Sequence, residues 1–410
     1  MEAGEREAAV RRNTTRLMVA EPMLRAVLTL TFTVAVVAVV DYSGRDAFAG
    51  FMASTNFVLV AVGSFAAGRA MDRVGRRPGL MIGYAVILAG CGLAAAAASA
   101  RSAGTLIAAI GLIGLGTGAA NLGRGAVADM HPPERRARTV GIVLAVGTVG
   151  AVGGPLLSAG VQHGAEHWLH SDPLLVPWAA TATLAVGAFF AVSRLRPDPR
   201  DLAVAATEGL APESGRRSVR ELLRVPALRT AVLAMGAAQA SMVGIMGITP
   251  VEIGHHGGGP VAVGATVSLH VAGMFAFSPI IGALLDRVGR RPGLIGGAVA
   301  SIAGAVITAI AAGSTLVMAI GLFLVGLGWS ASYLATTAVV SDVTGPGERA
   351  GALGLLDLVA ASAAAVGALA SGFMLELIGY ASVGWTVALL LLPVTFMASR
   401  LREPAFARAA

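Results

Sequence analysis

The residues Asp72–Leu80 read DRVGRRPGL, and the residues Asp286–Leu294 read DRVGRRPGL again, 214 positions later. An identity of this length at a fixed distance indicates an internal repeat. The repeat extends beyond these loops, because the second half also matches Gly114-Leu115-Gly116 and Asp129 with Gly326-Leu327-Gly328 and Asp342. The sequence therefore predicts a protein built from two homologous halves.

The chain is too apolar for a water-soluble protein. Of its 410 residues, 56% are hydrophobic and 13% are charged, whereas a soluble chain has about 25% charged residues. All basic residues are arginines, and they occur in short runs between long apolar stretches. The net positive charge therefore belongs to loops, and we expect no nucleic-acid partner. The single cysteine, Cys91, excludes an internal disulfide.

Apolar runs of about 20 residues are long enough to cross the ~30 Å hydrocarbon core of a bilayer as helices. The sequence predicts an all-α membrane protein, in which twelve transmembrane helices form two pseudo-symmetric six-helix bundles. The predicted helices are 24–42, 47–71, 79–100, 104–130, 139–162, 173–194, 228–251, 259–285, 293–313, 315–340, 351–376 and 379–399.

Arginines gather in every second loop between these helices. Since positive charge stays on the cytoplasmic side of a membrane, we predict that both termini are cytoplasmic and that the chain lies in a bacterial inner membrane. Arg6, Arg11, Arg12 and Arg16 precede helix 1, Arg25 lies at its start, and a dense group of arginines follows helix 6. The predicted division is an N-terminal bundle at 1–194, a cytoplasmic linker at 195–227 and a C-terminal bundle at 228–410.

The loop Gly68–Arg77 reads GRAMDRVGRR, and its second copy begins at Gly282. Both loops resemble the signature of the major facilitator superfamily, and the resemblance covers essentially the whole chain. It implies a secondary transporter whose two halves rock about a central cavity and expose it to each side in turn. It also implies that the signature loops hold a cytoplasmic gate closed in the outward-facing state.

The residues of the signature loop suit a charged latch on physical grounds. Gly68 makes room for a neighbouring helix, Gly75 permits a sharp turn, and Asp72 with the arginines forms a compact charged group. We expect its partners to be Asp129 and the N-terminus of helix 11, whose dipole favours an anion. The alternative is that these charges only set the topology. The predicted gating residues are Gly68, Asp72, Arg73, Gly75, Arg76, Arg77 and Asp129, with Gly282, Asp286, Arg287, Gly289, Arg290, Arg291 and Asp342 in the second copy.

Helix 5 is similar to a motif of proton-coupled drug antiporters through Gly141, Gly150, Gly154 and Pro155. The chain departs from these antiporters at Leu112, where they usually have an arginine. Small residues four apart let two helices approach closely, and proline bends a helix. We therefore expect helix 5 to pack tightly against helix 8, with ordinary helix packing as the alternative.

Charged residues inside a membrane span are costly and are therefore candidate functional groups. Asp357 lies in helix 11 and Arg124 lies at nearly the same depth in helix 4. We predict that they pair on the cytoplasmic side in the outward-open state, and that proton binding to Asp357 weakens the pair. A permanent structural ion pair is the alternative. His270, near the middle of helix 8, is either a proton relay or a hydrogen-bonded interhelical histidine.

Neutral polar and apolar side chains inside the predicted helices are candidates for contact with a substrate. The predicted substrate-binding residues are Asn121, Gln239, Ser241, Met242, Met246, Met274 and Trp329, with ordinary packing as the alternative for the methionines and Trp329. The pair His255-His256 raises the possibility of metal transport, but it lies in a glycine-rich loop, and we predict no metal site and no cofactor.

These patterns favour a proton-driven exporter of small apolar or amphipathic compounds. The alternative is proton-coupled transport of a specific polar metabolite or metal ion. A membrane-embedded enzyme is disfavoured, because the chain has no HExxH pair, and the absence of lysine rules out a phosphate-binding loop. The expected partners are a small-molecule substrate, protons and the lipid bilayer, and we expect a monomer.

Overall fold

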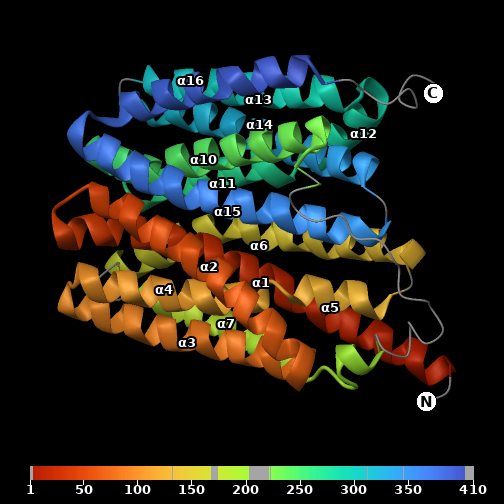
Figure 1. Ribbon diagram of the computed structural model, residues 1–410. Coiled ribbons are helices and arrows are strands. Elements are labelled where there is room, and N and C mark those ends of the chain that lie inside the picture. Colours follow the sequence, from red (N-terminus) through yellow and green to blue (C-terminus); the bar gives the residue numbers. More distant parts are fainter. Residues whose placement is uncertain are drawn as a thin grey trace. The chain divides into compact units, whose positions relative to one another are not determined.

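The computed structural model describes residues 3–131, 133–167, 174–202, 221, 223–311, 313–344 and 346–401. Over these residues the chain forms α-helices joined by short turns and contains no strand (Figure 1). In the same described part, twelve helical spans are long and apolar enough to cross a membrane. The predicted all-α membrane fold is therefore confirmed.

The helices of the first half of the sequence are α1 (Ala3–Ser43), α2 (Ala47–Val74), α3 (Arg76–Ala100), α4 (Ala103–Ala120), α5 (Gly123–Met130), α6 (Pro133–His167) and α7 (Val176–Ser193). The helices of the second half are α10 (Pro226–His255), α11 (Pro260–Phe275), α12 (Ser278–Val288), α13 (Arg290–Ala309), α14 (Thr315–Val343), α15 (Pro346–Leu377) and α16 (Tyr380–Ser399).

Three helices differ most from the sequence prediction. The sequence predicts helix 1 at 24–42, whereas α1 has 41 residues and begins at Ala3. At 1.5 Å per residue α1 is about 60 Å long, which is twice the ~30 Å thickness of the hydrocarbon core. The single helix predicted at 104–130 is divided into α4 and α5, and the one predicted at 259–285 is divided into α11 and α12.

The contacts within the chain define two units, and each is described by itself. Unit 1 comprises Met1–Gly44 and Thr55–Ala211, and unit 2 comprises Arg45–Ser54 and Pro212–Ala410. Residues 45–54 join unit 2 because the start of α2 packs against α15, where a Cβ added to Gly50 would lie 2.8 Å from the Cα of Gly372.

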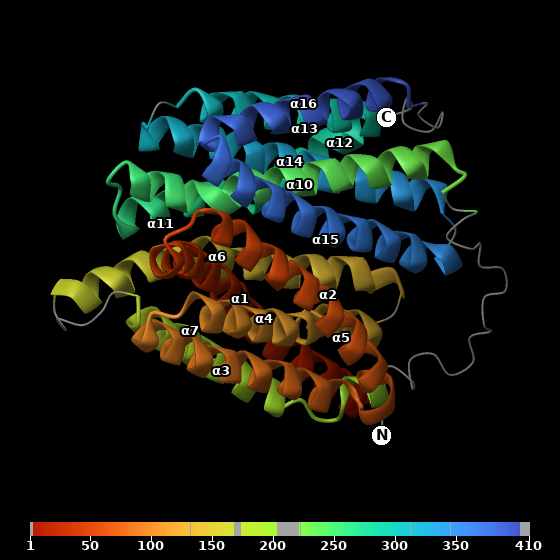
Figure 2. The ribbon, with the colours of Figure 1, turned by 60° about the vertical axis from the view of Figure 1, so that its left-hand side comes forward.

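The two units repeat the same packing pattern. In unit 1, α1 packs against α4, α6 and α7, and α3 packs against α4 and α7 (Figure 2). In unit 2, α10 packs against α14, α15 and α16, and α13 packs against α14 and α16. Each of these contacts in one unit has its counterpart in the other, so the repeat seen in the sequence is also present in the packing.

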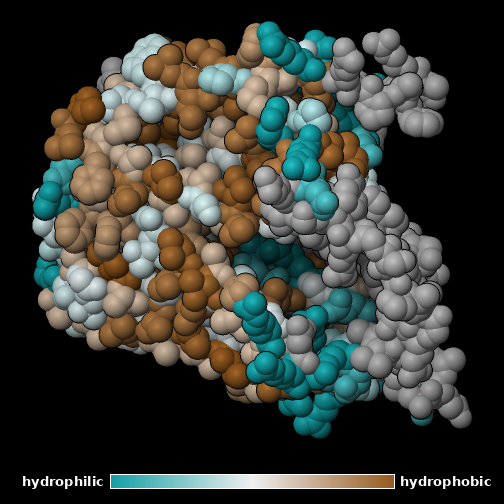
Figure 3. Space-filling model, viewed as in Figure 1, coloured by the Kyte–Doolittle hydropathy of each residue, from teal (hydrophilic) through white to brown (hydrophobic). Residues whose placement is uncertain are grey.

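Glycines at matching positions explain why corresponding helices lie so close together. A Cβ added to Gly116 of α4 would overlap the carbonyl of Gly83 in α3, and one added to Gly328 of α14 would lie 2.5 Å from the carbonyl oxygen of Gly297 in α13. Small residues allow this backbone approach without leaving a void. Large apolar side chains such as Val149, Ile280 and Leu316 are exposed instead, and Figure 3 shows hydrophobic residues over much of the face in view. Such exposed apolar surface suits contact with lipid.

Candidate functional site

The two signature loops have the same backbone conformation. Gly75 stands between α2 and α3 with φ 101° and ψ 162°, and Gly289 stands between α12 and α13 with φ 95° and ψ 174°. This region of backbone conformation is readily open only to glycine. Each loop therefore reverses the chain in a single residue, and the following helix begins at once with an arginine pair.

Each loop also holds an equivalent ion pair. In unit 1, a guanidinium nitrogen of Arg76 lies 3.0 Å from Oδ2 of Asp129 at the end of α5. In unit 2, Nε of Arg290 lies 3.1 Å from Oδ2 of Asp342 at the end of α14. All four side chains are partly exposed, and such pairs typically contribute about 0–1 kcal/mol. Their value therefore lies in positioning the loops rather than in stability.

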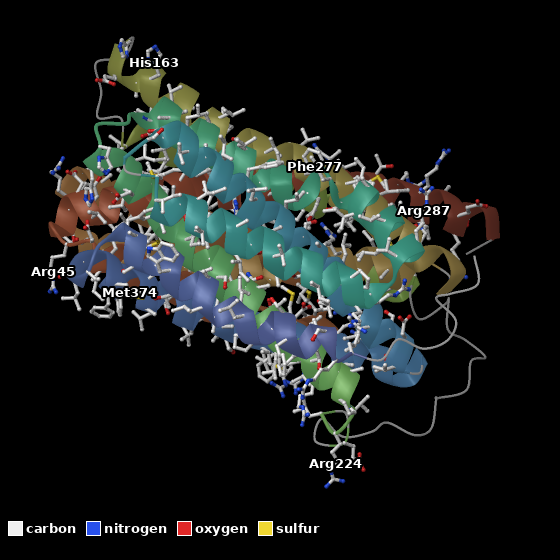
Figure 4. The ribbon with its side chains drawn as sticks, turned by 90° about the horizontal axis from the view of Figure 1, so that it is seen from above. Arg45, His163, Arg224, Phe277, Arg287 and Met374 are labelled. Atoms are coloured by element: carbon white, nitrogen blue, oxygen red, sulfur yellow. The ribbon has the colours of Figure 1, made fainter. Side chains whose placement is uncertain are left out.

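The other predicted gating residues are distributed around these pairs. Arg73, Arg287 and Arg291 are exposed, and Figure 4 shows Arg287 projecting from α12. Gly68 and Gly282 are not closely packed. A Cβ added to Gly68 would lie 4.0 Å from the side chain of Leu122, and a Cβ added to Gly282 would have no described atom within 4 Å. The side chains of Asp72 and Asp286 lie outside the described part of the structure, and the expected contact with helix 11 remains a prediction.

Asp198, which the sequence analysis did not single out, fixes the signature loop of unit 1. Its Oδ1 accepts a hydrogen bond from the backbone N–H of Arg76 at 3.0 Å, and its Oδ2 accepts one from Arg77 at 2.9 Å. The carboxylate thus caps the N-terminus of α3, where free N–H groups and the helix dipole favour an anion. A Cβ added to Gly75 would lie 2.7 Å from Oδ2 of Asp198. The cap therefore needs glycine at this position.

The segment after α7 is held in place by α1. The buried side chain of Asn13 donates to the carbonyl of Pro197 at 2.9 Å and accepts from the N–H of Arg196 at 3.2 Å. Leu195 and Leu202 are fully buried on unit 1. Residues 195–202 therefore pack as part of unit 1, although the sequence assigns them to the linker at 195–227. Residues 203–220 and 222 of that linker lie outside the described part.

The glycines of the helix-5 motif contact α1. A Cβ added to Gly150 would overlap the carbonyl oxygen of Pro22, and one added to Gly154 would overlap Oγ1 of Thr29. From the sequence we expect this glycine face to seat helix 8, but it is occupied by the neighbouring α1. Pro155 is buried within α6. Gly141 has no neighbouring atom within 4 Å of an added Cβ, so it is not part of this close contact.

A buried ion pair lies under this glycine face. Arg25 donates from Nε to Oε1 of Glu21 at 2.8 Å, and one of its terminal nitrogens lies 2.7 Å from the same oxygen. The side chain of Glu21 is 6% exposed and that of Arg25 is 19% exposed. Arg25 also donates to Oδ1 of Asn121, at the break between α4 and α5, at 3.2 Å. Asn121, a predicted substrate contact, is thus bound to Arg25.

The sequence analysis missed Glu21 because the predicted helix 1 begins at residue 24. That start was set by the first long apolar run, and it places Glu21 and Pro22 outside the helix. The signal available in the sequence was the i, i+4 spacing of Glu21 and Arg25, which favours an ion pair on one helix face.

In unit 2, two of the predicted substrate residues meet. The indole N–H of Trp329 on α14 donates to Oε1 of Gln239 on α10 at 2.7 Å. The Trp329 ring stacks on Tyr333 at 5.2 Å and meets the edge of Phe275 at 5.9 Å. We call these four side chains the aromatic cluster. Aromatic pairs in these geometries are favourable, and a hydrogen-bonded indole has a fixed orientation.

The remaining predicted substrate residues are mostly packed away. Met242 and Met274 are buried, Met246 is half-buried, and Ser241 is buried with no hydrogen-bond partner in the described structure. The buried methionines therefore belong to the core of unit 2, which is the packing alternative.

His270 is fully buried in α11. Its Nδ1 lies 2.6 Å from the carbonyl oxygen of Leu322 on α14, so Nδ1 carries the proton because a carbonyl can only accept. A Cβ added to Gly326 of α14 would lie 3.0 Å from the same nitrogen. This geometry favours the interhelical histidine over the proton relay. Arg124 and Asp357 belong to different units, and their pairing remains a prediction.

A second group of charges lies at the other end of unit 2. Arg45 donates from Nε to Oε1 of Glu376 at 3.0 Å, and the backbone N–H of Ala47 donates to Oε2 at 2.9 Å. His255 lies 3.3 Å from Asp46. Figure 4 shows Arg45 and Met374 at the end opposite Arg287. Within the described residues, no group of three or more histidine, cysteine or acidic side chains is arranged to hold a metal ion.

Comparisons with known proteins agree with this architecture. The sequence pattern described as Major Facilitator Superfamily matches residues 23–257 and 231–409. The chain is 32% identical to the uncharacterized MFS-type transporter YdeG of Bacillus subtilis, over 86% of this chain and 83% of YdeG. It is 27% identical to the riboflavin transporter RfnT of Brucella anthropi, over 82% of this chain and 83% of RfnT.

Two further similarities are more limited. The multidrug resistance protein MdtL of Escherichia coli O139:H28 is 32% identical, over only 30% of this chain and 31% of MdtL. The xylose transporter XylE of Escherichia coli, in a partially occluded inward-open conformation, shares the fold with a TM-score of 0.73 and 14% identity, over 98% of this chain and 100% of XylE. The chain therefore belongs to the major facilitator superfamily and is a multi-pass membrane transporter, not an enzyme.

Proposed function

We propose that the protein exports small apolar or amphipathic compounds, driven by the proton gradient, by alternating access between the two halves. The observation that carries the proposal is the aromatic cluster, in which Phe275 and Tyr333 pack on Trp329 and the indole N–H of Trp329 donates to Gln239. Stacked aromatic rings bind flat apolar or cationic molecules through their faces. A site of this composition suits lipophilic compounds better than sugars or inorganic anions.

Two further observations support export. The glycine and proline pattern of α6 is similar to that of proton-coupled drug antiporters, and part of the chain is similar to MdtL, a multidrug resistance protein. The chain has no phosphate-binding loop, so we infer that an ion gradient supplies the energy. We further propose that the protein works as a monomer in the bacterial inner membrane, with both termini in the cytoplasm.

The test is transport by purified protein in proteoliposomes with an imposed pH gradient. We expect movement of a flat lipophilic cation such as ethidium against its concentration gradient, and its loss when a protonophore collapses the gradient. The matched control is Trp329→Ala, which removes the centre of the aromatic cluster and should reduce ethidium transport. Gradient-independent transport in the wild type, or no transport of any lipophilic compound in a panel, would refute the proposal.

A second candidate is transport of one planar polar metabolite. It is favoured by the similarity to the riboflavin transporter RfnT, which covers 82% of this chain and 83% of RfnT. It is also favoured because stacked aromatic rings with one amide suit a heteroaromatic ring system. Saturable, competitive transport of riboflavin, with ethidium inactive as substrate and competitor, would favour this candidate over the exporter. The metal-ion alternative has no supporting cluster among the described residues.

A further inference from the structure

We propose that Glu21 is the proton-binding carboxylate of this transporter, and that Arg25 transmits its protonation state to the break between α4 and α5. The inference rests on the proposed proton coupling and assigns it to a site in unit 1. The contacts that carry it are all within that unit: Glu21 with Arg25 on α1, and Arg25 with Asn121 at the end of α4.

The first step is the placement of the carboxylate. Glu21 is almost fully buried in a helix of a membrane protein, where a charge is costly unless it is paired. Both contacts from Arg25 go to one oxygen, Oε1. Glu21 also lines a small cavity of about 10 Å³ together with Tyr84 of α3 and Gly123 of α5, which is roughly the space that one water molecule needs. The carboxylate therefore lies beside a space that one water molecule could fill.

The second step is the effect of adding a proton. Within the described part of the chain, the titratable and charged groups found around Glu21 are Arg25 on its own helix and Tyr84 on α3. The described contacts from α4, α5, α6 and α7 come from the uncharged residues Ala120, Gly123, Val143, Gly147 and Val192. Protonation removes the negative charge of Glu21, the one carboxylate paired with the Arg25 guanidinium among the described residues. A charge-assisted hydrogen bond is roughly twice as strong as a neutral one, so Arg25 then binds Glu21 less firmly and must satisfy its charge elsewhere.

The third step is what Arg25 holds. Its other described partner, Asn121, lies in the turn between α4 and α5, and the far end of α5 carries Asp129, the partner of Arg76 in the signature loop. The repeat provides a comparison, because the corresponding helix of unit 2, α14, runs unbroken from Thr315 to Val343. The fold therefore does not require a break here, and the break coincides with the residue that Arg25 binds.

The fourth step explains a glycine of α6. A Cβ added to Gly147 would lie 3.0 Å from Cγ of Glu21 and 3.3 Å from Cγ of Arg25. Three residues further, Gly150 is pressed against Pro22. Gly147 therefore leaves space for the side chains of Glu21 and Arg25 beside α6. A larger residue at this position would restrict the movement of these two side chains.

The test measures the movement of α5 directly and needs no substrate. Gly92 on α3 and Gly125 on α5 are exposed, and a Cβ at either position meets no atom within 4 Å. Spin labels on Gly92→Cys and Gly125→Cys, in a Cys91→Ala background, report the distance between the helices in lipid nanodiscs. The distance is measured at an acidic pH and at an alkaline pH.

We expect the distance to change between these two values in the labelled parent protein. Glu21→Gln, which is neutral at every pH, should show the acidic distance at both. Asp41→Asn is the matched control, since Asp41 of the same helix forms a partly exposed pair with Arg101, and it should behave like the parent. The inference is overturned if the parent distance does not depend on pH, or if Glu21→Gln still responds to pH as the parent does.

A transport measurement separates this inference from the proposed function. If wild-type protein moves ethidium only with a pH gradient, Glu21→Gln should move it at the same rate with and without the gradient, and should retain exchange of labelled for unlabelled ethidium. Absence of gradient-driven transport in the wild type overturns the proposed function. The assignment of Glu21 is overturned if transport by Glu21→Gln still depends on the gradient as it does in the wild type. It is also overturned if Glu21→Gln loses exchange while its elution profile on size exclusion, which reports correct folding, matches that of the parent.

Discussion

The close contact between α6 and α1 provides a sharp prediction for Gly150. A Cβ at this position would overlap the carbonyl oxygen and lie 2.5 Å from the carbonyl carbon of Pro22. Both partners are backbone atoms, so no side-chain rotation relieves the overlap, and the two helices must move apart. Overpacking of this kind destabilises the folded protein by about 1–3 kcal/mol. Replacement of a helical glycine by alanine stabilises the helix by about 0.5–1 kcal/mol.

We therefore expect Gly150→Ala to destabilise the protein by about 1 kcal/mol, because the difference between these two terms runs from about 0 to about 2.5 kcal/mol. For a unit of this size, a loss of about 1 kcal/mol corresponds to a fall of about 2–4 °C in melting temperature. The assay is thermal unfolding in detergent, followed by intrinsic fluorescence. Gly141→Ala is the matched control, because it is in the same helix with no atom within 4 Å of the added Cβ. It should be neutral or slightly stabilising. Equal melting temperatures for the two variants would refute the reasoning.

Three other substitutions test individual contacts. Asp198→Ala removes the cap of α3 and should cost about 1–2 kcal/mol in thermal unfolding, whereas the exposed neighbour Asp201→Ala should cost nothing measurable. Gln239→Leu leaves the indole N–H of Trp329 without an acceptor and should cost about 1–3 kcal/mol; adding Trp329→Phe removes the donor and should restore most of the stability, and no restoration would contradict the contact. His270→Gln should lower the melting temperature but leave the pH profile of transport unchanged, because the ring is a buried interhelical contact; an altered profile would revive the proton relay.

The sequence was most informative where the two halves repeat each other. The duplicated loop located the turns at Gly75 and Gly289, and the matching aspartates at 129 and 342 are the residues that pair with the arginines after those turns. The reason is physical: a positive φ requires glycine, and a loop arginine needs a nearby acid. Both requirements leave a mark in the local sequence.

The residues that the sequence did not reveal make their contacts over long separations. Asp198 caps a helix that begins more than 100 positions earlier, and nothing in its local sequence indicates which helix it meets. Glu21 is buried by helices that pack against α1 from several directions, whereas hydropathy alone places it just outside the first apolar run. The break after α4 likewise has no proline to announce it, since Asn121 and Leu122 are compatible with a continuous helix.

The differences between the two units are as informative as the repeat. By the offset that matches Gly114 with Gly326, Asn121 corresponds to Tyr333 and Thr117 corresponds to Trp329. The same stretch of helix thus carries the partner of Arg25 in unit 1 and the aromatic cluster in unit 2. Packing contacts and loop ion pairs are present in both units. The residues that we propose for proton binding and for substrate contact occupy equivalent places in opposite units. Because each half keeps its own scaffold, one could diverge toward energy coupling and the other toward recognition without loss of the shared fold.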